Sequence, residues 1–162
     1  MRAYTDKELS DLVKCVKCVV EPPLKLLKQE RGSKRNNMML QSKDGEYRFR
    51  VFIRQCLEFE EDFSVGLDYF PKDEPGSICL LRCNGQHGGN QVFPHHAHYH
   101  IHQAKAEDVN AGIKIERYVQ ITSEYASFRD GLAYFLTLIC LEEVDKYFPE
   151  LKQKNMFLSD SE

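Results

Sequence analysis

Hydrophobic and polar positions alternate along the middle of the chain. In the clearest run, residues 47–57, odd positions from Tyr47 to Ile53 are apolar, while even positions carry three arginines and Phe52. Residues two apart share a face of a β-strand, so one face would join the core and the other would carry guanidinium groups. Similar runs predict strands at 37–42, 63–70, 77–83, 97–103 and 115–122. The short turns between them, such as Asp44-Gly45, favour an antiparallel meander.

A helical period of 3.6 residues replaces this alternation near the N-terminus. Thr5 and Glu8 form a capping-box sequence at the start of an apolar periodic stretch. The stretch predicts one helix as far as Val20, ended by the Pro22-Pro23 pair. We expect a second short helix at 23–30, because proline is favoured in a first turn.

The C-terminal part predicts a long helix over 127–148, with Ser127 as its N-cap and Pro149 as its stop. Together these elements predict a single α+β domain over 1–162. An antiparallel sheet of five or six strands would carry the N-terminal and C-terminal helices on one face. The parts would be a helical segment (1–31), the sheet with a histidine-rich loop and strand (37–122), the helix (127–148) and a tail (149–162).

Composition places the chain among soluble globular domains, since 42% of its 162 residues are hydrophobic and 29% are charged. Its apolar runs are too short to span a bilayer, and its first residues lack the apolar core of a signal peptide. We therefore expect a cytoplasmic protein without a membrane partner, whose six cysteines are reduced thiols. Cys15 and Cys18 have CxxC spacing but lack a second pair, so we expect them to pack in the core or at its rim.

The net charge of −3 argues against general affinity for nucleic acid, but the charges are unevenly distributed. Nine Lys or Arg oppose three acids between Leu24 and Gln55, whereas seven acids oppose one Lys between Glu58 and Glu74. A local basic surface is expected from this pattern. The alternative is two solvated charged patches without a binding role.

All six histidines fall within residues 87–102, and this cluster is the main indication of chemistry. The predicted strand 97–103 would place His98, His100 and His102 on one face, with His95 and His96 just before it. Same-face neighbours lie about 6.6 to 7 Å apart along a strand, so two imidazoles can converge on a metal ion or a small anion. The alternative is an exposed face of histidines without a function.

Metal-free ribonuclease chemistry is our leading hypothesis. His98 and His100 would exchange the roles of general acid and base, because imidazole titrates near neutral pH. His95 or His96 would assist. Phosphate would be held by Arg82 and Arg50, with Arg48 and Arg54 as further candidates on the basic strand. This hypothesis needs no cofactor and takes RNA as the substrate.

Two other functions fit the same residues. A metal-dependent hydrolase would use His98, His100 and His102, with His87 or Asp68 as an extra ligand, to hold zinc or another divalent metal. A non-enzymatic binding or regulatory module would instead present the histidine and arginine face to a partner protein or nucleic acid.

The segments Leu81-Arg82-Cys83-Asn84-Gly85-Gln86-His87 and Phe93-Pro94-His95-His96-Ala97-His98 resemble the TumE-type proteins of bacterial and archaeal toxin–antitoxin pairs. The long helix expected after them also matches that pattern. The resemblance covers about the second half of the chain and implies a toxin-like protein that acts on RNA and has an antitoxin partner. It carries over Arg82, His87, His95, His96 and His98. The chain departs from the pattern in its extended histidine alternation and its N-terminal helix, so a related uncharacterised prokaryotic family fits as well.

Overall fold

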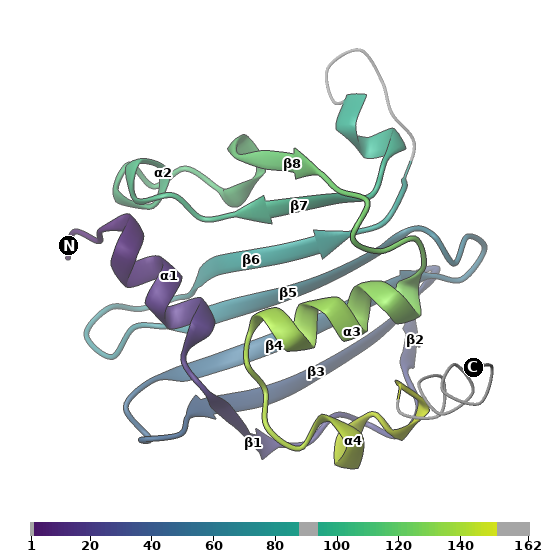
Figure 1. The fold of residues 1–162 in the computed structure, drawn as a ribbon, viewed down its shortest axis with the longest axis horizontal. Helices are drawn as coiled ribbons and strands as arrows, with labels where there is room; N and C mark the ends of the chain where they lie inside the picture. The colour runs from purple at the N-terminus through teal and green to yellow at the C-terminus, as the bar shows by residue number, and fades with distance from the viewer. Residues whose placement is uncertain (1, 88–93, 152–162) are drawn as a thin grey trace, which may run out of the picture.

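The computed structural model describes residues 2–87 and 94–151, which form an α+β fold around one antiparallel sheet (Figure 1). The strands are β1 (Lys17–Glu21), β2 (Lys28–Glu30), β3 (Ser33–Ser42), β4 (Arg48–Cys56), β5 (Phe63–Phe70), β6 (Ile78–Asn84), β7 (His100–Gln103) and β8 (Val119–Ile121). The helices are α1 (Asp6–Lys14), α2 (Ala106–Asn110), α3 (Phe128–Leu138) and α4 (Val144–Tyr147), with 3₁₀ turns η1 (Pro94–Ala97) and η2 (Ile115–Arg117). None of these helices has the length and apolarity to cross a membrane.

The sheet runs in the order β1-β3-β4-β5-β6-β7-β8, and β2 also pairs with β3. The antiparallel meander is confirmed, but the expected five or six strands are too few, since residues 2–87 and 94–151 alone form eight. The additional strands are short, or they contain polar residues that interrupt the apolar pattern of a strand. β2 is fully exposed, and β1 comes from residues whose periodicity also suits a helix.

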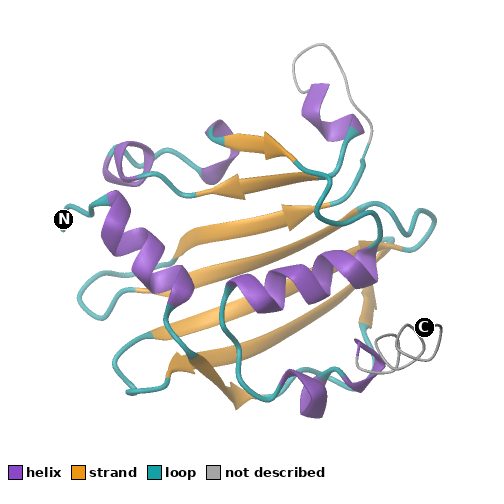
Figure 2. Cartoon of the chain, viewed as in Figure 1, coloured by secondary structure: helices purple, strands orange, loops and turns teal. Residues whose placement is uncertain are grey.

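The core lies on the face of the sheet that α1 and α3 cover (Figure 2). The alternation in β4 is confirmed, because Phe49, Val51 and Ile53 are buried on this inner face. The Phe63 ring packs edge-on against Phe128 at a centroid distance of 5.4 Å. We call the opposite face, which carries the even-numbered residues of β4, the outer face.

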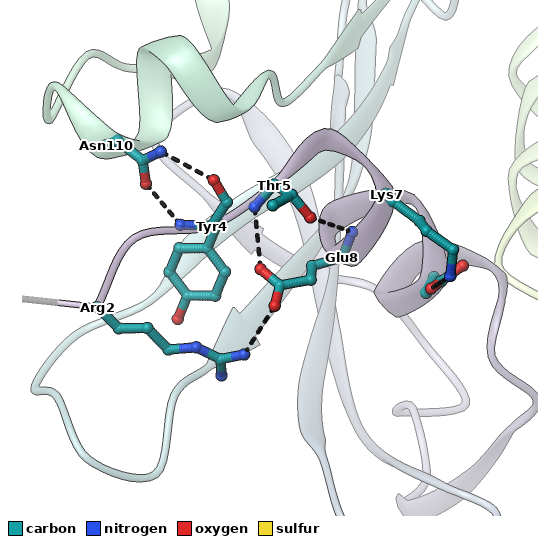
Figure 3. Close-up of polar contacts among 7 residues, drawn as sticks. Arg2, Tyr4, Thr5, Lys7, Glu8 and Asn110 are labelled. Carbon is teal, nitrogen blue, oxygen red and sulfur yellow. Dashed lines mark hydrogen bonds and ion pairs between the residues drawn. The ribbon is translucent and has the colours of Figure 1, made fainter.

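The N-terminal helix begins as expected and ends early. Thr5 and Glu8 form the capping box, and Tyr4 is tied to Asn110 by two hydrogen bonds of 2.8 and 2.9 Å (Figure 3). The helix ends at Lys14, however, and Val19 and Val20 belong to β1. β-branched residues favour a strand when a partner such as β3 is available. The expected helix at 23–30 is also wrong, since its last three residues form β2.

The C-terminal helix is broken into two. Ser127 caps α3 as expected, but α3 ends at Leu138 and α4 begins at Val144. Cys140 has a φ of 56°, which a helix cannot contain, and its carbonyl accepts the Lys17 backbone N–H at 3.0 Å. The pairing of this connection with β1 therefore replaces the helical hydrogen bonds. The predicted tail from residue 152 onward lies outside the described residues.

Candidate metal centre

Five of the six histidines converge on the outer face, at the end of the sheet where β6 leads to η1 and β7. His87 follows β6, His95 and His96 come from η1, and His100 and His102 come from β7. Their rings are in close contact: the centroid distances are 4.1 Å for His87–His96, 4.5 Å for His95–His96, 5.1 Å for His95–His100 and 5.2 Å for His100–His102. We call these five residues the histidine centre.

Two groups of three imidazoles within the centre have the spacing of a metal site. They are His87, His96 and His100, and His95, His100 and His102; within each group the ligand nitrogens all lie within 4.8 Å of one another. Zinc–imidazole bonds of about 2.0–2.1 Å in a tetrahedron require nitrogens about 3.3 Å apart. Small side-chain rotations would close the difference, and both groups depend on the shared residue His100.

Hydrogen bonds fix the tautomer of His100. Its Nδ1 lies 2.7 Å from the His98 carbonyl oxygen, which can only accept, so Nδ1 carries the proton. Its Nε2 is then an acceptor for the Asn84 amide nitrogen at 3.2 Å, while the Asn84 Oδ1 accepts the Ser64 hydroxyl at 2.7 Å. This chain of hydrogen bonds fixes the orientation of a fully buried ring and places the Asn84 amide on its Nε2 lone pair. A metal-ligating histidine has the same arrangement, with its other ring N–H on a carbonyl.

His102 is also fully buried, but its ring is not satisfied. Neither of its ring nitrogens has a hydrogen bond of good geometry among the residues that the structure describes, although the Ile115 backbone lies near enough to raise the His102 pKa. A neutral imidazole carries one donor and one acceptor, and burying both without partners costs free energy. A ligand that accepts the His102 lone pair would remove part of this cost.

Burial keeps these rings uncharged. It lowers the pKa of His100 to about 3, and neighbouring histidines, first His102, lower it further against the effect of the His98 carbonyl. Burial, Arg82 and His95 lower the pKa of His102 to about 4, opposed by the Ile115 backbone and Glu116. The pKa values of His87 and His95 are also lowered, mainly by desolvation. Neutral imidazole is the form that binds a metal, and it is a poor general acid at neutral pH.

His98 does not join the centre, which corrects the expected strand. β7 begins at His100 rather than at Ala97, because η1 brings the His98 N–H onto the His95 carbonyl at 3.0 Å. The His98 side chain is exposed, and only its carbonyl serves the centre through His100. The prediction that His98 shares a strand face with His100 and His102 is therefore wrong. Residues 88–93 of the expected histidine-rich loop lie outside the described residues.

The expected phosphate-binding arginines are mostly paired with acids. Arg50 donates to Asp68 at 2.6 and 3.2 Å, Arg54 to Asp62 at 3.0 Å and Arg82 to Glu116 at 3.3 Å. Arg48 is exposed. Asp68, an expected extra metal ligand, is bound by Arg50 and lies outside both histidine groups. Arg54 and Arg82 do act on the centre, since both help to lower the pKa of His87.

Sequence reasoning missed the residues that hold the centre. Asn84 and Ser64 orient His100, and the Tyr125 hydroxyl reaches the backbone carbonyls of Asn84 and His100 at 2.9 and 3.0 Å. The sequence signals for Asn84 were its parity with Arg82 on β6 and its place in the 81–87 segment. Its use required the pairing of Asn84 with His100 across the sheet.

No family model, curated protein or solved structure matches the chain. The site and the fold thus define only a class, an α+β protein with a partly buried cluster of imidazoles around His100 and His102.

Proposed function

We propose that the histidine centre binds one divalent transition-metal ion and uses it to activate water for hydrolysis. The observation that carries this proposal is the pair of three-imidazole groups that share His100, with ligand nitrogens within 4.8 Å of one another. A set of nitrogen ligands suits zinc, copper, nickel or iron, whereas magnesium and calcium prefer oxygen.

The tautomer of His100 supports a single ion. Its Nδ1 is held by the His98 carbonyl, so only Nε2 is available as a ligand. One Nε2 binds one ion, which makes the two groups alternative ways of completing the same site. The metal would take the place of the Asn84 amide on this lone pair.

Three imidazoles leave a coordination position for water. An ion held in this way lowers the pKa of bound water to about 7, which provides hydroxide at neutral pH. The neutral protein ligands leave the ion its full positive charge, which favours attack on a carbonyl or phosphoryl group.

Metal-free ribonuclease activity, with RNA as substrate and an antitoxin as partner, stays a prediction from the sequence. It needs one histidine that is protonated at neutral pH, and the pKa values of about 3 and 4 for His100 and His102 argue against that role. The exposed position of His98 separates it from His100. The geometry favours the metal-dependent alternative.

The test is a titration of EDTA-treated, tag-free protein with Co²⁺ and Zn²⁺, followed by calorimetry and by the Co²⁺ absorption spectrum. We expect one ion per chain, loss of binding in His100→Ala, and weaker binding in the less buried variants His95→Ala and His96→Ala. His98→Ala is the matched control and should bind normally. Failure to bind, or equal loss in His98→Ala, would contradict the proposal. RNA cleavage in EDTA that depends on His100 would restore the ribonuclease hypothesis.

A further inference from the structure

A cavity of about 440 Å³ lies beside the histidine centre, on the outer face of the sheet. Its floor includes Phe52 from β4 and Cys79 from β6, and its wall includes Val109, Ile113 and Ile115 from the α2–η2 segment. This volume is within the range of sites for small organic ligands. Apolar side chains line the cavity together with charged ones, which include Lys105 and Lys114 besides Arg82.

A glycine beneath the cavity and hydrogen bonds at the end of its wall define the shape of the cavity. Gly66 leaves space for the Phe52 ring, since a Cβ at Gly66 would lie 2.1 Å from the Phe52 Cζ. The wall is held at its far end by Asn110, which binds the backbone of Tyr4 (Figure 3). The Ala106 N–H adds a second link, because it donates to Asp6 at 2.7 Å. The cavity is therefore preformed.

Arg82 joins the cavity to the histidine centre. It lines the cavity, and on the sheet it is the direct register partner of His102, so both side chains lie on the outer face. A guanidinium has five N–H donors. Arg82 makes one hydrogen bond, of 3.3 Å to Glu116, and its Nε is buried without a partner among the described residues.

The other acids of the cavity are neutralised by arginines outside the Arg82 pair. Asp68 is bound by Arg50 at 2.6 Å, and Asp108 by Arg117 at 3.2 Å. The unused donors of Arg82 thus give the cavity a cationic end next to an apolar body. Such an end recognises a phosphate or carboxylate group.

We propose that this cavity binds an organic phosphate monoester, with its apolar group against Phe52, Val109 and Ile113 and its phosphoryl group on Arg82. The anionic group would then be the part nearest the histidine centre. A carboxylate in that position has no bond that water could cleave, whereas a phosphate ester does. The choice of a phosphate ester over a carboxylate therefore rests on the proposed hydrolytic function. Water would lose a proton and form a new P–O bond as hydroxide, the ester P–O bond would break, and the leaving alcohol would take up the proton that the water lost. The products are inorganic phosphate and the alcohol.

The binding step is tested without metal, by titrating EDTA-treated ¹⁵N-labelled protein with phenyl phosphate and following the amide resonances. We expect saturable shifts at residues 104–116, and binding of benzyl alcohol or inorganic phosphate that is at least about tenfold weaker, since each has only half of the recognised chemistry. Arg82→Met and the cavity-filling Val109→Trp should each weaken binding by about tenfold or more. Arg48→Met, an exposed arginine outside the cavity, is the control and should bind normally.

One variant separates recognition from a structural role of Arg82. Glu116→Gln removes the charge that competes for the guanidinium, so phenyl phosphate should bind more tightly by several-fold, about 0.5–1 kcal/mol as a rim ion pair. A purely structural Arg82–Glu116 pair predicts weaker binding instead. Equal binding of benzyl alcohol and phenyl phosphate, or no effect of Val109→Trp in a protein with an unchanged amide spectrum, would overturn the proposal.

The link to the histidine centre is tested with Co²⁺-loaded protein. Paramagnetic broadening should be stronger for the ³¹P resonance of phenyl phosphate than for its ring protons, and hydrolysis should release phenol. Absence of Co²⁺ binding would reject the proposed function and leave the metal-free result for the cavity intact. Bound Co²⁺ with broadening strongest at the ring would reject the orientation proposed here.

Discussion

Lys17 and His102 are both fully buried polar residues, but they differ in how completely their polar atoms are hydrogen-bonded. The Lys17 ammonium donates to the carbonyls of Val13 and Cys15 at 2.7 Å and to that of Ile139 at 3.0 Å. All three of its donors are used. Neither ring nitrogen of His102 has a hydrogen bond of good geometry in the described chain, and only the Ile115 backbone lies near enough to act on its pKa. The complete set of hydrogen bonds gives Lys17 a structural role, whereas the unsatisfied ring of His102 is what the proposed metal site would explain.

The partners of Lys17 explain why a buried charge is tolerated there. They are backbone carbonyls at the ends of α1 and α3, where helices carry partial negative charge. The Phe49 ring lies 4.8 Å from the ammonium and adds a cation–π contact. Burial lowers the Lys17 pKa, so the charge is held at a cost that these contacts offset. Lys17 thereby joins both helices to the sheet.

Replacement of Lys17 should therefore have the largest effect on stability. Lys17→Met leaves three carbonyls of two helix ends without a donor, and we expect a loss of at least about 3 kcal/mol in the free energy of unfolding. Urea denaturation measures this loss. Lys14→Met, an exposed lysine in α1, is the control and should change stability by less than about 0.5 kcal/mol. Similar small effects in both variants would contradict the structural role of Lys17.

Lowering the pH should reduce the stability of the fold through the two buried rings of the histidine centre. The folded pKa values of about 3 for His100 and about 4 for His102 lie below the value of 6.5 for an unperturbed histidine. Below pH 6.5 the unfolded chain therefore binds more protons than the folded one. Stability is complete above this pH and is lost as the pH falls toward 4, by about 1.4 kcal/mol per pH unit for each ring.

Urea unfolding of the metal-free protein in EDTA at pH 7, 6 and 5 measures this slope. His102→Leu should reduce the slope by the share of one ring, whereas His98→Ala, which changes an exposed ring, should leave it unchanged. A flat profile between pH 7 and 5 would mean that the folded and unfolded chains bind the same number of protons, so that folding does not lower the pKa values of the two rings.

The strands in the sheet were predictable where one face is apolar, and the site was predictable only as a cluster. β4 alternates in sequence and in burial, because the inner face is packed and the outer face is partly open. β5 is buried on both faces, since Phe52 covers Gly66 and Arg50 covers Asp68 on the outer face, and alternation alone could not indicate that. The helix predicted as far as Val20 ended early because β1 could pair with β3. Local periodicity does not contain that long-range choice.

The histidine centre illustrates the same limit. The parity of 98, 100 and 102 depends on where the strand begins, and the η1 turn moves that start to His100. His87, His95 and His96 reach the centre through turns whose geometry the sequence does not specify. The pairing of Asn84 with His100 is a matter of register between strands, which only the assembled sheet defines.

His102→Leu tests the comparison directly, because it removes an unsatisfied buried group. In the metal-free protein at pH 7 we expect unchanged or greater stability, by up to about 2 kcal/mol, since leucine has no polar atoms to bury. Metal affinity should fall in the same variant. Thermal unfolding with and without Zn²⁺ measures both effects. A large loss of stability without metal would show that His102 supports the fold, as Lys17 does.

Tyr125→Phe should have the smallest effect. It tests whether the histidine centre depends on a structural hydrogen bond to its backbone. The buried Tyr125 hydroxyl bonds to the carbonyls of Asn84 and His100, so it supports the strands that hold the centre without touching the ligand nitrogens. Its removal should cost about 1 kcal/mol of stability and lower metal affinity by about tenfold. Tyr99→Phe is the matched control, because its hydroxyl bonds to the exposed Ala126 carbonyl, and it should leave metal affinity unchanged. Equal changes in the two variants would mean that position 125 acts by packing alone, and that the centre does not depend on its backbone support.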